Sequence, residues 1–144
     1  LINPAITDIE RKEILDQVSV HLGNEANLHF FPDKVGNLAP YIYSKSLVNL
    51  MIPPRVLTTG IPMQAMEVMG SRGFLLCGYQ ADLANAFIPG EEVVLFDSRQ
   101  DLLEKLTYFM EHGKERTSIT KAALEKIRTE HTFARRLDIL LQYG

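Results

Sequence analysis

Cysteine is nearly absent from this sequence, and tryptophan is absent altogether. The single cysteine, Cys77, excludes a disulfide within the chain, and its place in the most apolar stretch predicts a buried, unreactive thiol. Basic residues do not outnumber acidic ones: the net charge of −3 argues against a nucleic-acid partner, since such a partner needs a basic surface. No apolar run has the length of a membrane span, and Leu1 begins no signal-peptide pattern, so we expect no membrane span and a cytoplasmic location.

The signatures of several common chemistries are missing as well. The sequence has neither a GxxxxGK[ST] phosphate loop nor a GxGxxG turn after a strand. The usual motifs of nucleoside-triphosphate hydrolases and of dinucleotide-dependent oxidoreductases are therefore absent. It has no GxSxG nucleophile elbow. The four histidines, which are His21, His29, His112 and His131, lack the spacing of metal ligands. We therefore expect neither a metal nor a cofactor.

What is present is the composition of one soluble globular domain over residues 1–144, with 46% hydrophobic and 23% charged residues. Apolar runs predict four strands, and amphipathic segments with helical spacing alternate with them. The predicted strands cover 27–31, 46–52, 73–77 and 93–96, and the predicted helices cover 7–22, 38–43, 62–70, 80–87, 99–112, 114–130 and 132–142.

This alternation predicts an α/β fold: a Rossmann-like parallel sheet with right-handed crossovers and helices on both faces. Sheets of this kind bind ligands at the carboxyl ends of their strands. Here that edge would be formed by the loops after Phe31, Ile52 and Cys77.

The helix that follows Gly60 is the best candidate for a binding element. Pro62 suits the first helical position, and Gly70 or Gly73 would end the helix in the left-handed conformation. Its free N–H groups and its dipole favour an anion at the N-terminus, and Glu67 lies on its polar face. The residues alone leave two interpretations open: an anion site, or an ordinary amphipathic helix with a solvated glutamate.

Segments spread over nearly the whole chain follow one another in a particular order. They are TDIER with IL (7–15), YSKSLVNL (43–50), GIP with EVM and GFLL (60–76), YQADL (79–83), FIPGEE (87–92) and EHTF with RL (130–137). This series resembles the C-terminal half of the B-type glycosyltransferases, in particular the group related to the spore maturation protein CgeB. The core pattern of that group is GIPxRxFEIMACGGFLL.

The resemblance implies a domain that holds a nucleotide-diphosphate-sugar donor as substrate, in a hexosyltransferase-like enzyme. In such enzymes a second, N-terminal domain binds the acceptor and faces the donor domain across a cleft. Carried over to this sequence, Gly60, Ile61 and Pro62 lie near the diphosphate, and Glu67 binds the ribose hydroxyls.

Two departures from the wider family concern the site. Retaining relatives have a first glutamate at the position of Thr59, which the CgeB-like pattern also lacks, so no catalytic residue is assigned. The usual arginine is Gln64 here, which makes a phosphate contact neutral and weaker. Arg55 is either its replacement or a surface cation beside two prolines.

The leading hypothesis is therefore the donor-binding domain of a longer glycosyltransferase, whose first strand and acceptor domain would precede Leu1 and without which the chain is inactive. The alternative is a non-catalytic nucleotide-binding or structural module that kept the fold. Thr59 and Gln64 favour the alternative, whereas Glu67 and the intact Gly60–Pro62 segment favour the enzyme. An unrelated phospho-ligand-binding domain of Rossmann type is a third possibility.

Overall fold

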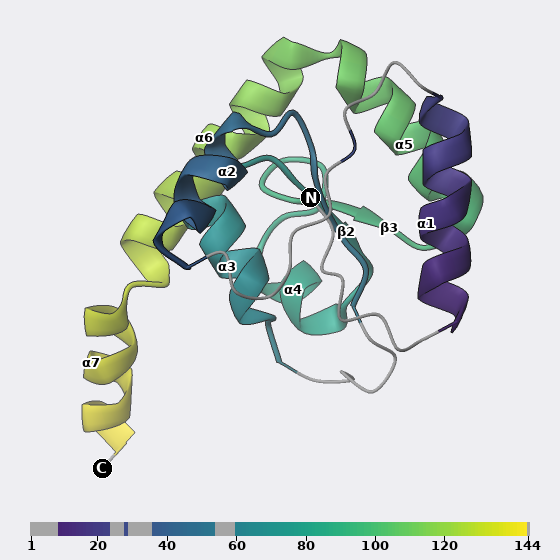
Figure 1. Cartoon of the computed structure of the whole chain (residues 1–144). Coiled ribbons are helices and arrows are strands. Elements are labelled where there is room, and N and C mark those ends of the chain that lie inside the picture. Colours follow the sequence, from purple (N-terminus) through teal and green to yellow (C-terminus); the bar gives the residue numbers. More distant parts are fainter. Residues whose placement is uncertain (1–8, 24–27, 29–35, 54–59, 144) are drawn as a thin grey trace.

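The computed structural model describes residues 9–23, 28, 36–53 and 60–143, and it is an α/β fold (Figure 1). None of the helices in these residues is long and apolar enough to cross a membrane. The elements in chain order are α1 (Ile9–Leu22), η1 (Gly36–Leu38), α2 (Ala39–Lys45), β1 (Asn49–Met51), α3 (Met63–Gly70), β2 (Leu75–Gly78), α4 (Ala81–Ala86), β3 (Val94–Phe96), α5 (Arg99–Glu111), α6 (Gly113–Glu130) and α7 (Phe133–Tyr143).

The three strands form a parallel sheet in the order β1-β2-β3, as the alternation of strands and helices predicts. In the register, Leu50 pairs with Leu76, and Leu76 with Val94. Each strand is shorter than or shifted from its predicted range; residues 46–48, for example, precede the first pairing of β1. Of the strand predicted over 27–31, only residue 28 lies within the described residues.

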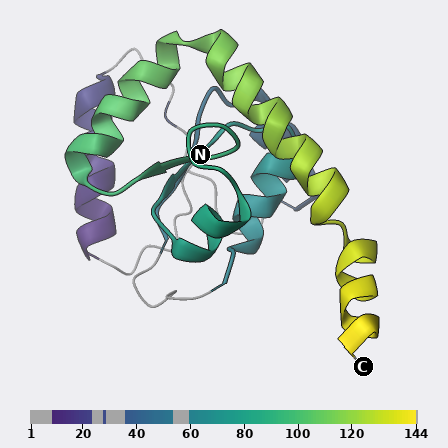
Figure 2. The same cartoon turned by 180° about the vertical axis from the view of Figure 1, so that it is seen from behind.

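Helices cover both faces of the sheet, which confirms the predicted architecture (Figures 1 and 2). Successive side chains of a strand point to opposite faces, so each strand contributes to two cores. One core joins the sheet to α1 and α5 through Leu15, Val18, Leu50, Ile52, Phe74, Leu76, Val94, Phe96, Leu102, Leu106 and Phe109, with Ile119 of α6. The other joins it to α2, α3 and α4 through Tyr43, Met51, Ala65, Val68, Met69, Leu75, Cys77, Leu83, Phe87, Val93 and Leu95, with Ala123 of α6.

The interior position of Cys77 in β2 follows from this arrangement. Its side chain is 0% exposed, and burial raises the pKa of the thiol to about 12. The predicted burial of this cysteine is confirmed, and a thiol that stays protonated is a poor nucleophile.

The ends of α3 differ from the prediction. Pro62 is the N-cap residue, with φ −58° and ψ 131°, and the helix itself begins at Met63. At the other end, Gly73 N–H bonds to Val68 C=O at 2.9 Å and Arg72 N–H to Met69 C=O at 3.2 Å, which is a Schellman motif. The left-handed residue of this motif is Arg72, with φ 63°, and neither Gly70 nor Gly73 has a positive φ.

Gly73 is required by space instead. A Cβ atom on this residue would lie 2.8 Å from Asn49 Nδ2, 2.9 Å from Tyr43 C=O and 3.0 Å from Val68 Cγ1. Asn49 is itself 1% exposed and donates to Tyr43 C=O at 3.0 Å and Phe74 C=O at 3.2 Å. The buried amide thus joins the end of α2 to the start of β2, and Gly73 makes room for it.

The C-terminal helix α7 stands apart from the sheet. In both views it extends beyond the end of α6 and away from the body of the molecule (Figures 1 and 2). Its apolar side chains are exposed, among them Leu137, Ile139, Leu140 and Leu141.

Candidate functional site

A pocket of about 530 Å³ opens at the carboxyl edge of the sheet, where parallel α/β sheets bind their ligands. It is formed by the residues that follow all three strands, by the first turns of α1 and by the N-terminus of α5. Its lining consists of Glu10, Ile14, Ile52, Pro53, Gly78, Tyr79, Gln80, Phe96, Asp97, Ser98, Arg99 and Leu102. Aromatic, apolar and polar side chains together form a lining typical of small-molecule sites.

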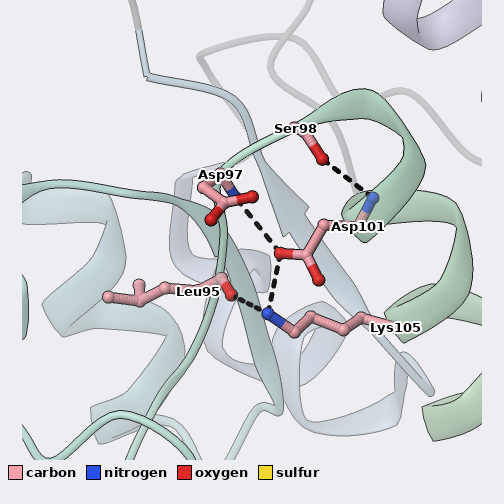
Figure 3. A network of polar contacts seen from close by, with 5 residues as sticks. All are labelled: Leu95, Asp97, Ser98, Asp101 and Lys105. Carbon is pink, nitrogen blue, oxygen red and sulfur yellow. Dashed lines mark hydrogen bonds and ion pairs between the residues drawn. The ribbon is translucent and has the colours of Figure 1, made fainter.

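One wall of this pocket, at the junction of β3 and α5, is fixed by a polar network (Figure 3). Ser98 caps α5, because its Oγ accepts a hydrogen bond from Asp101 N–H at 3.1 Å. Asp101 Oδ2 accepts from Asp97 N–H at 3.2 Å and from Lys105 Nζ at 2.7 Å. Lys105 also donates to Leu95 C=O at 2.7 Å, so α5 is bonded both to β3 and, through Asp101, to Asp97 directly after it.

The N-terminus of α3 lies at the same edge of the sheet, because the helix follows β1 and precedes the parallel strand β2. The first two N–H groups of α3, on Met63 and Gln64, have no acceptor among the described residues. Ala65 N–H bonds to Pro62 C=O at 3.0 Å and closes the first turn. Two free donors at the positive end of a helix dipole favour an anion.

Gly60 has a positive φ of 88°, which glycine adopts readily. Its N–H donates to the carboxylate of Asp82 on α4, so that it is already bonded. Of the predicted phosphate donors, the chain therefore offers the helix amides of Met63 and Gln64 rather than the amide of Gly60. Asp82 ties the segment before α3 to the helix after β2.

Gln64 and Glu67 both influence the phenol of Tyr43 in α2. Burial raises the pKa of the Tyr43 phenol, a hydrogen bond from the Gln64 side chain lowers it, and the negative charge of Glu67 raises it. The side chain of Glu67 is exposed. A carboxylate in this position remains open to a ligand, whereas the Gln64 amide already has a partner within the fold.

The structure thus brings Gly60, Ile61, Pro62, Gln64 and Glu67 together around the first half of α3. These described members of the predicted site do not line the 530 Å³ pocket. Arg55 and Thr59 lie outside the described residues.

The pocket residues after β2 and β3, among them Tyr79, Asp97 and Ser98, were missed as site residues. The rule that ligands bind at strand ends, which predicts the loop after Cys77, holds equally for the loop after Phe96. The signal was available in Asp97 and Ser98, two polar residues directly after a buried strand.

A parallel sheet with helices on both faces and a pocket at its carboxyl edge defines a Rossmann-like α/β domain. A family model described as glycosyl transferase-like matches residues 14–142, and the chain therefore belongs to this glycosyltransferase family. No curated protein and no solved structure gives a significant match to the chain.

Proposed function

We propose that this domain binds the nucleotide-diphosphate-sugar donor of a glycosyltransferase at the carboxyl edge of its sheet. The observation that carries the proposal is the start of α3 in a chain of this family. There the N–H groups of Met63 and Gln64 have no acceptor among the described residues, and the carboxylate of Glu67 is exposed. The diphosphate would bind the helix N-terminus, where the dipole is positive. Glu67 would accept hydrogen bonds from the vicinal ribose hydroxyls.

The rest of the donor would occupy the pocket beyond α3. Tyr79 is 61% exposed and lines this pocket, so its ring is available to pack on a base or a sugar. Because Gln64 is neutral and hydrogen-bonded to Tyr43, it contributes less to phosphate binding than an arginine would. Arg55 is our candidate for the missing positive charge.

We further propose that the enzyme is CgeB-like and transfers a hexose with the help of an acceptor-binding domain on the same longer chain. Transfer requires that donor and acceptor be aligned and that water be excluded, which a single open domain does not provide. Residues 1–144 alone are therefore expected to bind the nucleotide without transferring a sugar. Steady-state turnover of a nucleotide sugar onto an acceptor by this chain alone would contradict that expectation.

Titration calorimetry with the diphosphates of uridine, guanosine, adenosine and thymidine tests the donor site. Glu67→Gln keeps the shape of the side chain and removes its charge. A charged hydrogen bond contributes about 1.5–3 kcal/mol, so the affinity for the preferred nucleotide should fall about tenfold or more. Glu91→Gln is the matched control, because Glu91 is exposed and its side chain has no partner among the described residues.

Equal nucleotide affinities for the wild type and Glu67→Gln would remove Glu67 from the site. A loss of folding stability in Glu67→Gln would instead make this glutamate a structural residue. If none of the four diphosphates binds, the donor proposal fails for the isolated chain.

A non-catalytic module is the second candidate function. It is favoured by two contacts at the start of α3: Asp82 occupies the Gly60 amide, and Tyr43 occupies the Gln64 side chain. The same titration separates the two candidates only in part, because such a module could still bind a nucleotide. The decisive measurement is sugar transfer by the full-length chain, which the module would lack.

A further inference from the structure

A groove of about 600 Å³ lies at the amino edge of the sheet, opposite to the candidate donor site. It is bounded by the end of α2, the residues before β1 and β2, and one face of α6. Its lining consists of Ser44, Lys45, Ser46, Leu47, Arg72, Phe74, Arg116, Thr117, Thr120, Lys121, Leu124 and Arg128. These include five cationic side chains and no carboxylate, in a chain whose net charge is −3.

Contacts within the fold account for two of the five cations. Lys45 Nζ lies 5.8 Å from the centroid of the Tyr41 ring. Arg116 donates to two carbonyls near the end of α5, those of Phe109 and Met110, the latter at 3.0 Å. The other three, Arg72, Lys121 and Arg128, have no hydrogen-bond or ion-pair partner among the described residues. Arg128 lies in the last turn of α6, where the helix dipole favours a cation. Lys121 is in the middle of that helix, so the dipole does not account for its charge.

Arg72 gives a second, independent indication. It occupies the left-handed position of the Schellman motif, with φ 63°, where glycine would adopt the same backbone without strain. Its side chain is exposed, so packing does not require an arginine there. A strained residue that the fold does not need is a recognised sign of a ligand site.

We propose that this groove is a second anion site, which binds a ligand carrying two or more phosphate charges. Guanidinium groups match phosphate oxygens with paired N–H donors. Arg72 comes from the segment between α3 and β2, whereas Arg128 and Lys121 both come from α6 and add two further charges. The exposed side chain of Leu47 and the ring of Phe74 give the same groove an apolar component. The ligand is either a soluble polyphosphate or the headgroup of an anionic lipid, since both present this chemistry.

Tripolyphosphate is the probe for the shared chemistry, titrated by calorimetry at low and high salt. Lys121→Ala should weaken its binding about tenfold, the loss expected for one charged hydrogen bond. Lys114→Ala is the matched control: Lys114 is also exposed, unpaired among the described residues and on α6, but it lies outside the groove. Its affinity should stay within about twofold, since removing one screened surface charge has little effect.

Arg72→Gly provides a readout that a purely structural arginine would not give. It should raise the melting temperature, because glycine relieves the left-handed strain, and at the same time weaken tripolyphosphate binding about tenfold. Arg72→Lys keeps the charge but not the paired N–H donors, so it should weaken binding less than Arg72→Gly does. Unchanged binding in both Lys121→Ala and Arg72→Gly would overturn the proposal.

The donor site must be separated from this groove in the same assay. An excess of the preferred nucleoside diphosphate should leave tripolyphosphate binding to the groove in place. If the nucleotide displaces tripolyphosphate and Lys121→Ala has no effect, the anion binds at α3 and the second site does not exist. Failure of every nucleotide to bind would refute the donor site alone.

Vesicles distinguish the two sources of the ligand. Co-sedimentation with vesicles that contain cardiolipin, whose headgroup carries two phosphates, would identify a lipid headgroup if it is lost in Lys121→Ala and absent with phosphatidylcholine alone. Binding of tripolyphosphate without binding of either vesicle would identify a soluble ligand. Binding of neither probe would refute the site.

Discussion

Replacing Gly73 with alanine tests the tightest contact in the fold. The residue lies between α3 and β2, and its φ is not positive, so the substitution introduces no backbone strain of the left-handed kind. The new methyl group would instead meet Asn49 Nδ2 at 2.8 Å, Tyr43 C=O at 2.9 Å and Val68 Cγ1 at 3.0 Å. The Tyr43 carbonyl can move away only if α2 moves. The Asn49 side chain can move away only if it gives up its hydrogen bonds to Tyr43 C=O and Phe74 C=O.

The expected cost combines three effects. Overpacking a filled site costs about 1–3 kcal/mol. Loss of one of the two Asn49 hydrogen bonds costs about a further 1 kcal/mol, because the amide is buried. Alanine reduces the freedom of the unfolded chain and returns about 0.4–1 kcal/mol. We therefore expect Gly73→Ala to lower the free energy of unfolding by about 1–3.5 kcal/mol.

Gly70→Ala is the control, three residues earlier in the chain. A Cβ on Gly70 meets nothing within 4 Å, and the residue is the last of α3, so alanine should stabilise the domain by up to about 1 kcal/mol. Urea unfolding followed by far-ultraviolet circular dichroism measures both variants. Thermal midpoints should separate by about 2–4 °C for each kcal/mol of difference. Equal midpoints for Gly73→Ala and the wild type would show that the site around Asn49 is not closely packed.

Two further predictions concern Cys77 and Ser98. Burial raises the pKa of the Cys77 thiol from 9.0 to about 12, so the native protein favours the protonated thiol more than the unfolded chain does. The resulting contribution to folding stability is complete below about pH 9 and is lost as the pH rises toward 12. Urea midpoints of the wild type should fall above pH 9 more steeply than those of Cys77→Ala, and identical slopes would argue that the thiol is accessible to water. Ser98→Ala removes the acceptor of Asp101 N–H and should cost about 1 kcal/mol in the same unfolding assay. Ser118→Ala on the exposed part of α6 should change stability by less than about 0.5 kcal/mol, and an equal effect of the two substitutions would deny Ser98 its capping role.

The sheet could be predicted from the sequence because its strands are buried on both faces. Short apolar runs such as Leu75–Cys77 and Val94–Phe96, separated by helices, admit only a parallel arrangement with crossovers. The exact ends of the strands are harder to predict, because they depend on pairing with the neighbouring strand rather than on composition. Val48 is as apolar as its neighbours, but the ladder with β2 starts at Asn49.

The candidate site could be predicted only as far as its backbone. Pro62 and the Gly60–Pro62 segment located the start of α3, but the partners of Gly60 and Gln64 come from distant segments. Asp82 lies on α4 and Tyr43 on α2, and no local pattern links either residue to α3. Contacts of this kind are set by tertiary packing, which sequence periodicity does not encode.

The end of α3 shows how two adjacent positions can favour glycine for different physical reasons. The pattern that the sequence resembles has glycine at both positions, where this chain has Arg72 and Gly73. At the first position a side chain costs only the left-handed backbone, about 1–2 kcal/mol, and has open solvent to enter. At the second position it must displace the Asn49 amide and a backbone carbonyl, which costs more and disturbs α2 and β2 together. The position where a side chain is tolerated is therefore the one that carries an arginine, and that arginine lines the groove we propose for a phosphate ligand.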